Sequence, residues 1–255
     1  MTDAQPANLM PGAEPWTHDG GPIGVLVLHG FTGNPASMRG VAEAMAEAGF
    51  TVDLPRLPGH GTTVEDMIPT GWSDWLDHAE AHYRALAERC DQVVVVGLSM
   101  GGALTAWLGS EHPEIAGLVC INAVVSAPAG MREAVQEVLA TGADRFAGIG
   151  SDIARPDRVE SSYAETPLAP LLTLFGAADD LGDRLTQITA PVLVITSRDD
   201  HVVPPENSDI LAAQVSGPVE RLWCERSYHV VTMDYDADLV IAAAVDFTTK
   251  VTASA

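Results

Sequence analysis

The sequence predicts an α/β protein with a mostly parallel central sheet, helices on both faces of that sheet and a small helical cap insertion. Short apolar runs alternate with segments of helical periodicity, which is typical of parallel strands joined by helices. The run QVVVVGL, residues 92–98, is apolar without alternation, as expected of a strand buried on both faces. The chain has 255 residues, of which 47% are hydrophobic, and this is enough for one large core.

Seven segments are predicted to be strands of one sheet. Residues 14–21, EPWTHDGG, are typical of an antiparallel edge strand and a turn, and they lead into a buried strand at residues 23–28. The other predicted strands are residues 50–55, 92–98, 117–124, 191–197 and 219–225. Helical segments connect most of them, so we expect parallel pairing.

Five helices are predicted outside one long insertion. Asn34 and Pro35 suit an N-cap and a first helical position, and Gly49 suits the end of that helix. The other predicted helices are residues 72–89, 101–112, 207–214 and 236–251.

Residues 126–187 interrupt the alternation, because no strand is predicted within them. MREAVQEVLA and PLAPLLTLFGAA are predicted helices, and the polar stretch GSDIARPDRVESSYAET separates them. An insertion of this length between two strands is usually functional or forms a small subdomain. We therefore expect a core of residues 1–125 and 188–255, with residues 126–187 inserted as a helical cap.

The charge balance excludes several classes of partner. Asp and Glu number 35 against 13 Lys and Arg, which gives a net charge of −22. Such a surface repels phosphate backbones and anionic membranes, so we expect no nucleic-acid partner and no stable membrane insertion. Solubility accounts for the excess of acid, and a high-salt habitat is a second explanation that the sequence leaves open.

Cysteine usage and the first residues favour a cytoplasmic location. Cys90, Cys120 and Cys224 are odd in number and widely spaced, which is typical of reduced packing residues. The segment MTDAQPANLMPGAEPW has neither a basic region nor an apolar region of a signal peptide. No G-x-G-x-x-G spacing is present, and we expect no cofactor. A homodimer is left open.

A lone serine between glycines follows the most apolar strand. GLSMG, residues 97–101, has the spacing G-x-S-x-G and stands between a predicted strand and a predicted helix. A sharp turn there exposes the hydroxyl of Ser99 at the edge of the sheet, and the flanking glycines let the turn close. We therefore predict Ser99 as a catalytic nucleophile.

The acid and the base of a serine triad are expected later in the chain, at the same sheet edge. His229 lies in a loop after the last predicted strand, and it is the predicted general base. Asp199 and Asp200 both end the strand before it, so either can orient the histidine by this pattern. Asp234 and Asp236 are further rivals close to His229 in sequence.

Two backbone N–H groups are expected to bind the oxyanion. One follows the nucleophile and belongs to Met100; the other comes from the loop HGFTG, residues 29–33, where Phe31 is the predicted donor. His29 and His60 are predicted to brace loops near the site. His78 and His82 have the spacing of metal ligands on a helix, but no third ligand completes the set, so we predict a solvated helix face.

The chain resembles the α/β-hydrolase superfamily, and within it the bacterial monoacylglycerol lipases and the small carboxylesterases of bacilli. Seven segments carry the resemblance: LHGFTGNPASMR, LPRLPGHGT, VVGLSMGG, INAVV, GSDIARPDRVESSYAETP, DDHVVPPENSDI and SYHVVTMDYD. It implies that Asp200, in the run DHVVP, is the acid rather than Asp199. It also implies the oxyanion roles of Phe31 and Met100, a mobile cap, and contact of Glu160 with glycerol hydroxyls.

The predicted activity is that of a serine hydrolase of carboxylic esters, acting on monoacylglycerols through an acyl-enzyme. A short-chain carboxylesterase with the same triad is the nearest alternative. A hydrolase fold kept as a non-catalytic binding module, and a haloperoxidase or carbon–carbon hydrolase, are the others. Apolar residues of the insertion are predicted to wall an acyl tunnel: Val135, Val138, Leu139, Leu171, Leu172 and Phe175.

Salt should stabilise this protein. Unpaired carboxylates repel one another at low ionic strength, and added NaCl screens that repulsion. We expect the Tm in calorimetry to rise by about 2–4 °C for each kcal/mol of repulsion screened between low and moderate NaCl. A flat or falling Tm would mean that the acidic groups are locally paired.

Overall fold

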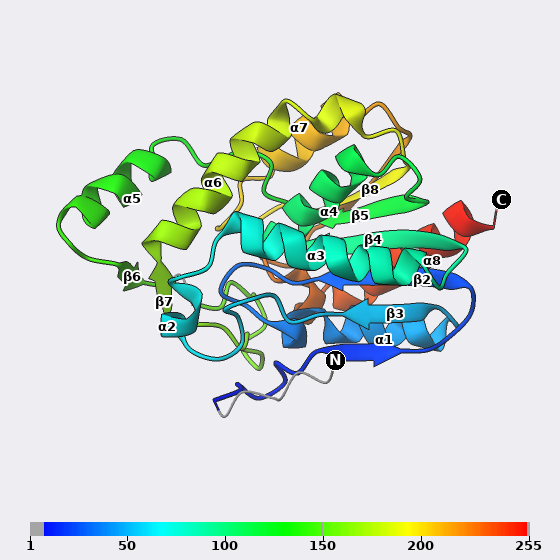
Figure 1. Ribbon diagram of the computed structural model, residues 1–255, viewed down its shortest axis with the longest axis horizontal. Helices are drawn as coiled ribbons and strands as arrows, with labels where there is room; N and C mark the ends of the chain where they lie inside the picture. The colour runs from blue at the N-terminus through cyan, green and yellow to red at the C-terminus, as the bar shows by residue number, and fades with distance from the viewer. Residues whose placement is uncertain (1–7, 149, 254–255) are drawn as a thin grey trace.

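The computed structural model describes residues 8–148 and 150–253. Its main sheet has seven strands in the order β1-β3-β2-β4-β5-β8-β9, with β1 antiparallel to β3 and the other pairs parallel (Figure 1). The strands are β1 (Trp16–His18), β2 (Ile23–Leu28), β3 (Thr51–Leu54), β4 (Gln92–Leu98), β5 (Gly117–Ile121), β8 (Val192–Ser197) and β9 (Val219–Cys224). All seven predicted strands are confirmed.

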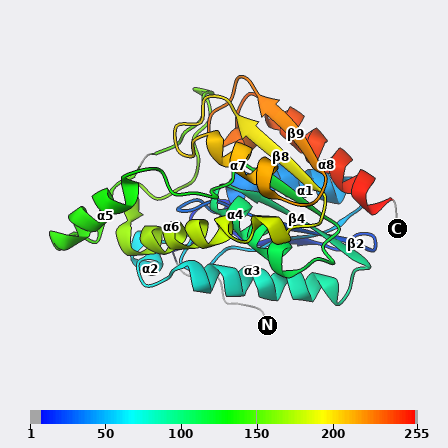
Figure 2. The same ribbon diagram turned by 90° about the horizontal axis from the view of Figure 1, so that it is seen from above.

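Helices cover both faces of this sheet (Figure 2). They are α1 (Arg39–Glu47), α3 (Trp72–Ala87), α4 (Met100–Glu111), α7 (Glu206–Gln214) and α8 (Ala237–Thr252), with short 3₁₀ turns at Pro35–Met38, Leu185–Gln187 and Val231–Met233. The one-turn helix α2 (Val64–Met67) lies beside β7 (Glu165–Pro167) of the insertion. Asn34 caps the first of these turns, since its side chain accepts a hydrogen bond from Ala36 N. The sequence did not predict the one-turn helix α2.

Burial on both faces of the sheet explains the run of four valines in the central strand β4. Val93 and Val95 pack into the core beneath α3 and α4, whereas Val94 and Val96 pack into the core beneath α1 and α8. Each of these four side chains is nearly or fully buried, so an alternating polar residue has no place in the strand.

The insertion contains two helices, α5 (Met131–Ala140) and α6 (Leu168–Gly182), as predicted. It also contains a small antiparallel sheet of β6 (Arg145–Ala147) and β7 (Glu165–Pro167), which the sequence did not predict. Neither three-residue strand stands out in the sequence as an apolar run or an alternating pattern. In Figure 1, α5 projects from the body of the molecule, while α6 runs back over it.

The boundary between core and cap stays a prediction. Helix α6 packs against α5 at one end and contacts α3 and α4 of the core. None of the helices in the described part of the chain has the length and apolarity that a bilayer crossing requires.

Candidate active site

The chain turns sharply at Ser99, between the end of β4 and the start of α4. Ser99 has φ 58° and ψ −116°, a conformation that L-residues rarely adopt. A Cβ atom at Gly97 would overlap the carbonyl group of Gly101, and one at Gly101 would overlap the carbonyl group of Leu28. The G-x-S-x-G spacing is therefore a steric requirement of this turn.

The loop after β2 runs beside Ser99 and is braced from behind. His29 is fully buried; its Nδ1 lies 3.0 Å from Gly30 O, and its Nε2 accepts a hydrogen bond from Leu57 N at 3.1 Å. Burial, and then the nearby His60, hold the pKa of His29 well below its usual value, so the ring is neutral. His29 thus braces the loop, as predicted.

Phe31 is held in this loop by aromatic contacts. Its ring meets Trp75 edge-on at a centroid distance of 5.7 Å and His60 at 6.4 Å. His60 is buried too, with Nδ1 2.9 Å from Pro58 O, so it braces its own loop. Met100 is the first residue of α4, and an N–H at that position has no partner within its helix. Met100 directly follows Ser99, and Phe31 follows Gly30, where a Cβ atom would lie 3.4 Å from Ser99 Cβ; their oxyanion roles stay predictions.

His229 and Asp200 form a buried pair. Nδ1 of His229 lies 2.7 Å from Asp200 Oδ2, and the two side chains are 8% and 1% exposed. The other carboxylate oxygen of Asp200 accepts hydrogen bonds from Val202 N and Val203 N, both at 2.8 Å. Asp200 therefore has a fixed orientation, and Nδ1 of His229 is the nitrogen that donates to it.

The surroundings of His229 favour its protonated form. Burial alone would lower the pKa of His229, but three carboxylates act against it. The charge and hydrogen bond of Asp200, with the charges of Glu160 and Asp152, raise the pKa above its usual value. Such an environment stabilises an imidazolium, which is what a general base becomes.

The other candidate aspartates, Asp199, Asp234 and Asp236, do not pair with His229. Asp199 is exposed. The carboxylate of Asp234 accepts hydrogen bonds from Ala154 N and Tyr228 N, and that of Asp236 from Arg226 N. Both therefore hold loops, and neither is bonded to the His229 ring.

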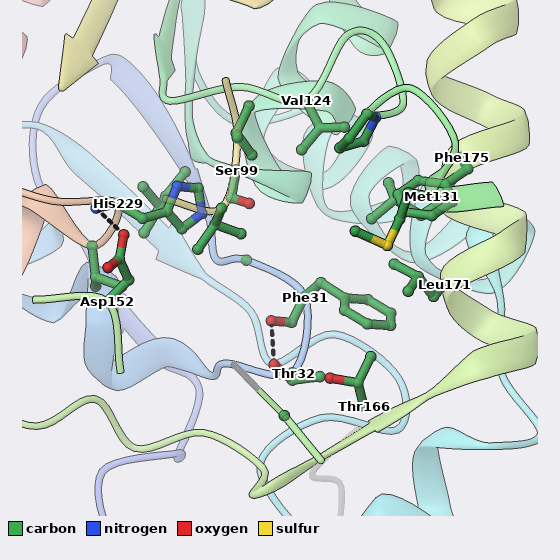
Figure 3. Close-up of a pocket in the computed structure, with 18 of the residues that line it drawn as sticks. Phe31, Thr32, Ser99, Val124, Met131, Asp152, Thr166, Leu171, Phe175 and His229 are labelled. Atoms are coloured by element: carbon green, nitrogen blue, oxygen red, sulfur yellow. Dashed lines mark hydrogen bonds between the residues drawn. The ribbon is translucent and has the colours of Figure 1, made fainter. Parts of the chain in front are cut away.

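Ser99 and His229 open into one pocket between the sheet edge and the insertion. In Figure 3 the ring of His229 points toward Ser99, and Leu171, Phe175 and Met131 face them across the pocket. Apolar side chains from both regions make most of its wall: Phe31, Leu98, Val124, Met131, Phe146, Leu171, Leu174, Phe175, Val202, Val203 and Val230.

The predicted acyl tunnel is only partly right. Leu171 and Phe175 line the pocket, as predicted. Val135, Val138, Leu139 and Leu172 do not line the pocket; they belong to an apolar cluster of the insertion that also includes Leu171 and Phe175. Helical periodicity locates the apolar face of a helix, but it does not say which residues face a neighbouring helix and which face a ligand.

Glu160 lies in the same pocket. A Cβ atom at Gly33 would lie 2.9 Å from its Oε1, so the carboxyl group reaches the loop that follows β2. Burial raises the pKa of Glu160 to about 7, and the nearby His229 partly offsets this.

Two residues of the site were missed by the sequence analysis. Asp152 lines the pocket and accepts a hydrogen bond from His229 N at 3.0 Å (Figure 3). Asn122, at φ 44° after β5, donates to His229 O at 2.8 Å. Asn122 could have been suspected, because it follows a predicted strand at the catalytic edge. Asp152 had no such signal within its polar stretch.

The paired histidines of α3 have a different environment from the predicted solvated face. His82 Nδ1 lies 2.7 Å from Asp53 Oδ2, which links α3 to β3. Across the described residues, no group of three or more His, Cys, Asp or Glu side chains is placed to hold a metal ion.

Comparisons with known proteins agree with this architecture. The hydrolase family model described as "Serine aminopeptidase, S33" matches residues 23–236, which is most of the chain. The chain belongs to this family. A solved structure of the metagenome-derived lipolytic enzymes LipS and LipT superposes on it with a TM-score of 0.91 at 42% identity, covering 95% of this chain and 99% of that one. The predicted α/β-hydrolase fold is confirmed.

Two curated relatives extend over nearly the whole chain. A thermostable monoacylglycerol lipase from Bacillus sp. (strain H-257) is 44% identical over 95% of this chain and 96% of its own length. A carboxylesterase from Bacillus subtilis (strain 168) is 31% identical over 93% of this chain and 96% of its own length. A monoacylglycerol lipase structure from Paleococcus ferrophilus, at 17% identity and a TM-score of 0.76, shares the fold.

The two adjacent aspartates should behave very differently when mutated. Asp200→Asn removes the charge that faces His229 and presents an amide to its Nδ1, which disturbs the tautomer; we expect kcat to fall about 10⁴-fold. Asp199→Asn, at an exposed neighbour, is the matched control and should stay within about twofold of wild type. Steady-state hydrolysis of a soluble nitrophenyl ester measures both, and the reverse order would assign the acid to Asp199.

Proposed function

We propose that the protein hydrolyses monoacylglycerols to glycerol and a fatty acid, with Ser99, His229 and Asp200 as its catalytic triad. It is a hydrolase of carboxylic esters, a class common to its relatives over nearly their whole length. The observation that carries the proposal is the pocket itself, where an apolar wall and one carboxyl group, that of Glu160, surround Ser99 and His229. The apolar wall suits a long acyl chain, and the carboxyl group of Glu160 suits the hydroxyl groups of glycerol.

The proposed reaction has two halves. Ser99 Oγ attacks the acyl carbon while His229 Nε2 takes its proton, and the N–H groups of Phe31 and Met100 bind the oxyanion. The tetrahedral intermediate collapses, the C–O bond to glycerol breaks, and the departing alkoxide takes the proton from His229. Water then attacks the acyl-enzyme, gives a proton to His229, and releases the fatty acid as Ser99 recovers its proton.

A cytoplasmic location and a small-molecule lipid ester as substrate belong to the same proposal. The cysteines Cys90, Cys120 and Cys224 are all free, which supports a reducing compartment. Asp152 and Glu160 line the pocket, and no Lys or Arg is among its described lining residues. This supports a neutral ligand over a phosphorylated one.

The proposal is tested by comparing kcat/KM for a monoacylglycerol, the methyl ester of the same acid, a triacylglycerol and an aminoacyl arylamide. We expect the monoacylglycerol to be the best substrate and the arylamide to be unreactive. Ser99→Ala should remain folded, lose labelling by a fluorophosphonate and fall about 10⁶-fold in kcat. Hydrolysis that survives in Ser99→Ala would refute the mechanism, and a preference for the shortest methyl esters would make the protein a short-chain carboxylesterase.

Acyl-chain selectivity should change when the pocket wall is filled. Each CH₂ of substrate buried in the pocket is worth about 0.8 kcal/mol, or about fourfold in kcat/KM, until the pocket is full. Leu171→Trp places a larger ring in the wall, so the optimal chain should shorten while the shortest esters keep their rates. Val138→Trp is the matched control, because Val138 belongs to the same apolar cluster as Leu171 but does not line the pocket; its chain-length profile should stay close to that of wild type. A profile unchanged in Leu171→Trp would place the acyl chain elsewhere.

Glu160 should act on the alcohol side of the ester. Glu160→Gln should reduce kcat/KM for a monoacylglycerol about tenfold more than for the matched methyl ester, since hydrogen bonds to a charged acceptor are worth about 1.5–3 kcal/mol. In the wild type the glycerol preference should rise as pH increases through about 7, where Glu160 ionises, and in the variant it should not. Equal losses on both esters would remove Glu160 from the glycerol site.

A further inference from the structure

One carboxylate of the insertion holds both loops that carry the proposed base and acid. Asp152 Oδ2 accepts hydrogen bonds from His229 N at 3.0 Å and from His201 N at 3.2 Å. Its other oxygen lies 2.8 Å from Nδ1 of His201, and its backbone carbonyl accepts a hydrogen bond from Val230 N at 3.1 Å. His201 follows Asp200 directly, so Asp152 connects the two triad loops to each other.

We propose that Asp152 is a positioning residue for catalysis, which fixes His229 relative to Asp200 from the insertion side. The inference rests on the proposed triad. On this proposal, the segment after β6 has two roles: it holds the catalytic residues in position, and it forms part of the pocket wall.

The backbone of His229 is held from two sides. Asp152 binds its N–H from the insertion, while Asn122 binds its carbonyl from the end of β5. Asn122 also makes two hydrogen bonds with Ser197 at the end of β8. Asn122 Nδ2 donates to Ser197 Oγ, and Ser197 N donates to Asn122 Oδ1. The core thus fixes one side of the histidine, and the other side depends on a residue that is distant in sequence.

The Asp152 side chain is well placed for this role. It is 11% exposed, whereas the side chain of His201 is 57% exposed. Figure 3 shows the carboxylate at the backbone of His229, away from the ring edge that faces Ser99. Asp152 therefore orients the base without entering the space where an ester would react.

The segment that carries Asp152 is itself fixed at both ends. Near its start, Ala154 N and Arg155 N donate to the carboxylate of Asp234. Further on, Asn34 Nδ2 donates to Ser161 O, and Tyr163 N donates to Thr32 O at 3.1 Å, in the loop beside Phe31. The same stretch thus reaches from the His229 loop to the predicted oxyanion loop. Because these hydrogen bonds fix the stretch, it can hold the His229 loop and the predicted oxyanion loop in fixed positions relative to each other.

Asp152→Asn keeps the shape of the side chain but removes its charge and one acceptor. We expect kcat on a soluble ester to fall about 10- to 100-fold, because small misplacement of a catalytic group has effects of this size. KM should change little, since the pocket wall is kept. Fluorophosphonate titration of active sites gives kcat per competent site, so a fraction of misfolded protein does not enter the result.

The pH profile separates positioning from a purely structural role. Three carboxylates face His229: Asp200 from the loop after β8, and Asp152 and Glu160 from the insertion. His229 must be neutral to accept the proton of Ser99, so kcat/KM rises with pH through its pKa. Loss of the negative charge of Asp152 lowers that pKa, and the acid limb should move to lower pH. Asp152→Glu keeps the charge, and its acid limb should stay at the wild-type position.

Asp157→Asn is the matched control: Asp157 lies in the same segment, is exposed and pairs with Arg155. It should match wild type in kcat, KM and acid limb. If Asp152→Asn keeps kcat per site within about twofold, or keeps the wild-type acid limb, the positioning role is wrong. If the wild type hydrolyses no ester, or Ser99→Ala remains active, the proposed function fails instead.

Discussion

The strained backbone at Ser99 is the constraint on which the rest of the site depends. A residue at φ 58° raises the free energy by about 1–3 kcal/mol, and the turn persists because its surroundings leave it no alternative. The strand before it is buried on both faces, and the helix after it lies against the sheet. Gly30, in the loop after β2, packs against this turn: a Cβ atom at Gly30 would lie 3.4 Å from Ser99 Cβ. Ser99 and the loop of residues 29–33, which carries the proposed oxyanion donor Phe31, are thus fixed by the same close packing.

Polar contacts extend this rigidity to the rest of the site. Packing fixes the serine, but His229 and Asp200 stand on loops beyond the ends of β9 and β8. Their positions depend on hydrogen bonds to backbone groups, supplied by Asn122, Asp152 and Asp234. Val230 and Val231 anchor the His229 loop in the core, and buried carboxylates and amides then fix its backbone by hydrogen bonds.

Local patterns in the sequence predicted most of the fold, and they predicted the sharp turn at Ser99. Most of the seven strands are short apolar runs bounded by turns, and the G-x-S-x-G spacing is a local steric condition, so both can be recognised from a few residues. The choice between Asp199 and Asp200 is not local, because it depends on which carboxylate turns inward; only the family resemblance separated them. Asp152 was not predictable, since its partner His229 is 77 residues away. Val138 and Leu171 lie on the apolar faces of two helices and belong to one cluster, but only Leu171 also lines the pocket, a difference that helical periodicity does not show.

The charge of the pocket has a consequence for the end of each catalytic cycle. An ester that enters is neutral, but the acid formed from it is an anion at neutral pH, and it faces Asp152 and Glu160 with no described Lys or Arg in the lining. Like charges repel one another more strongly in a partly buried pocket than in water. Ester cleavage therefore turns a neutral ligand into an anion inside an acidic pocket, which favours release of the carboxylate product over its retention.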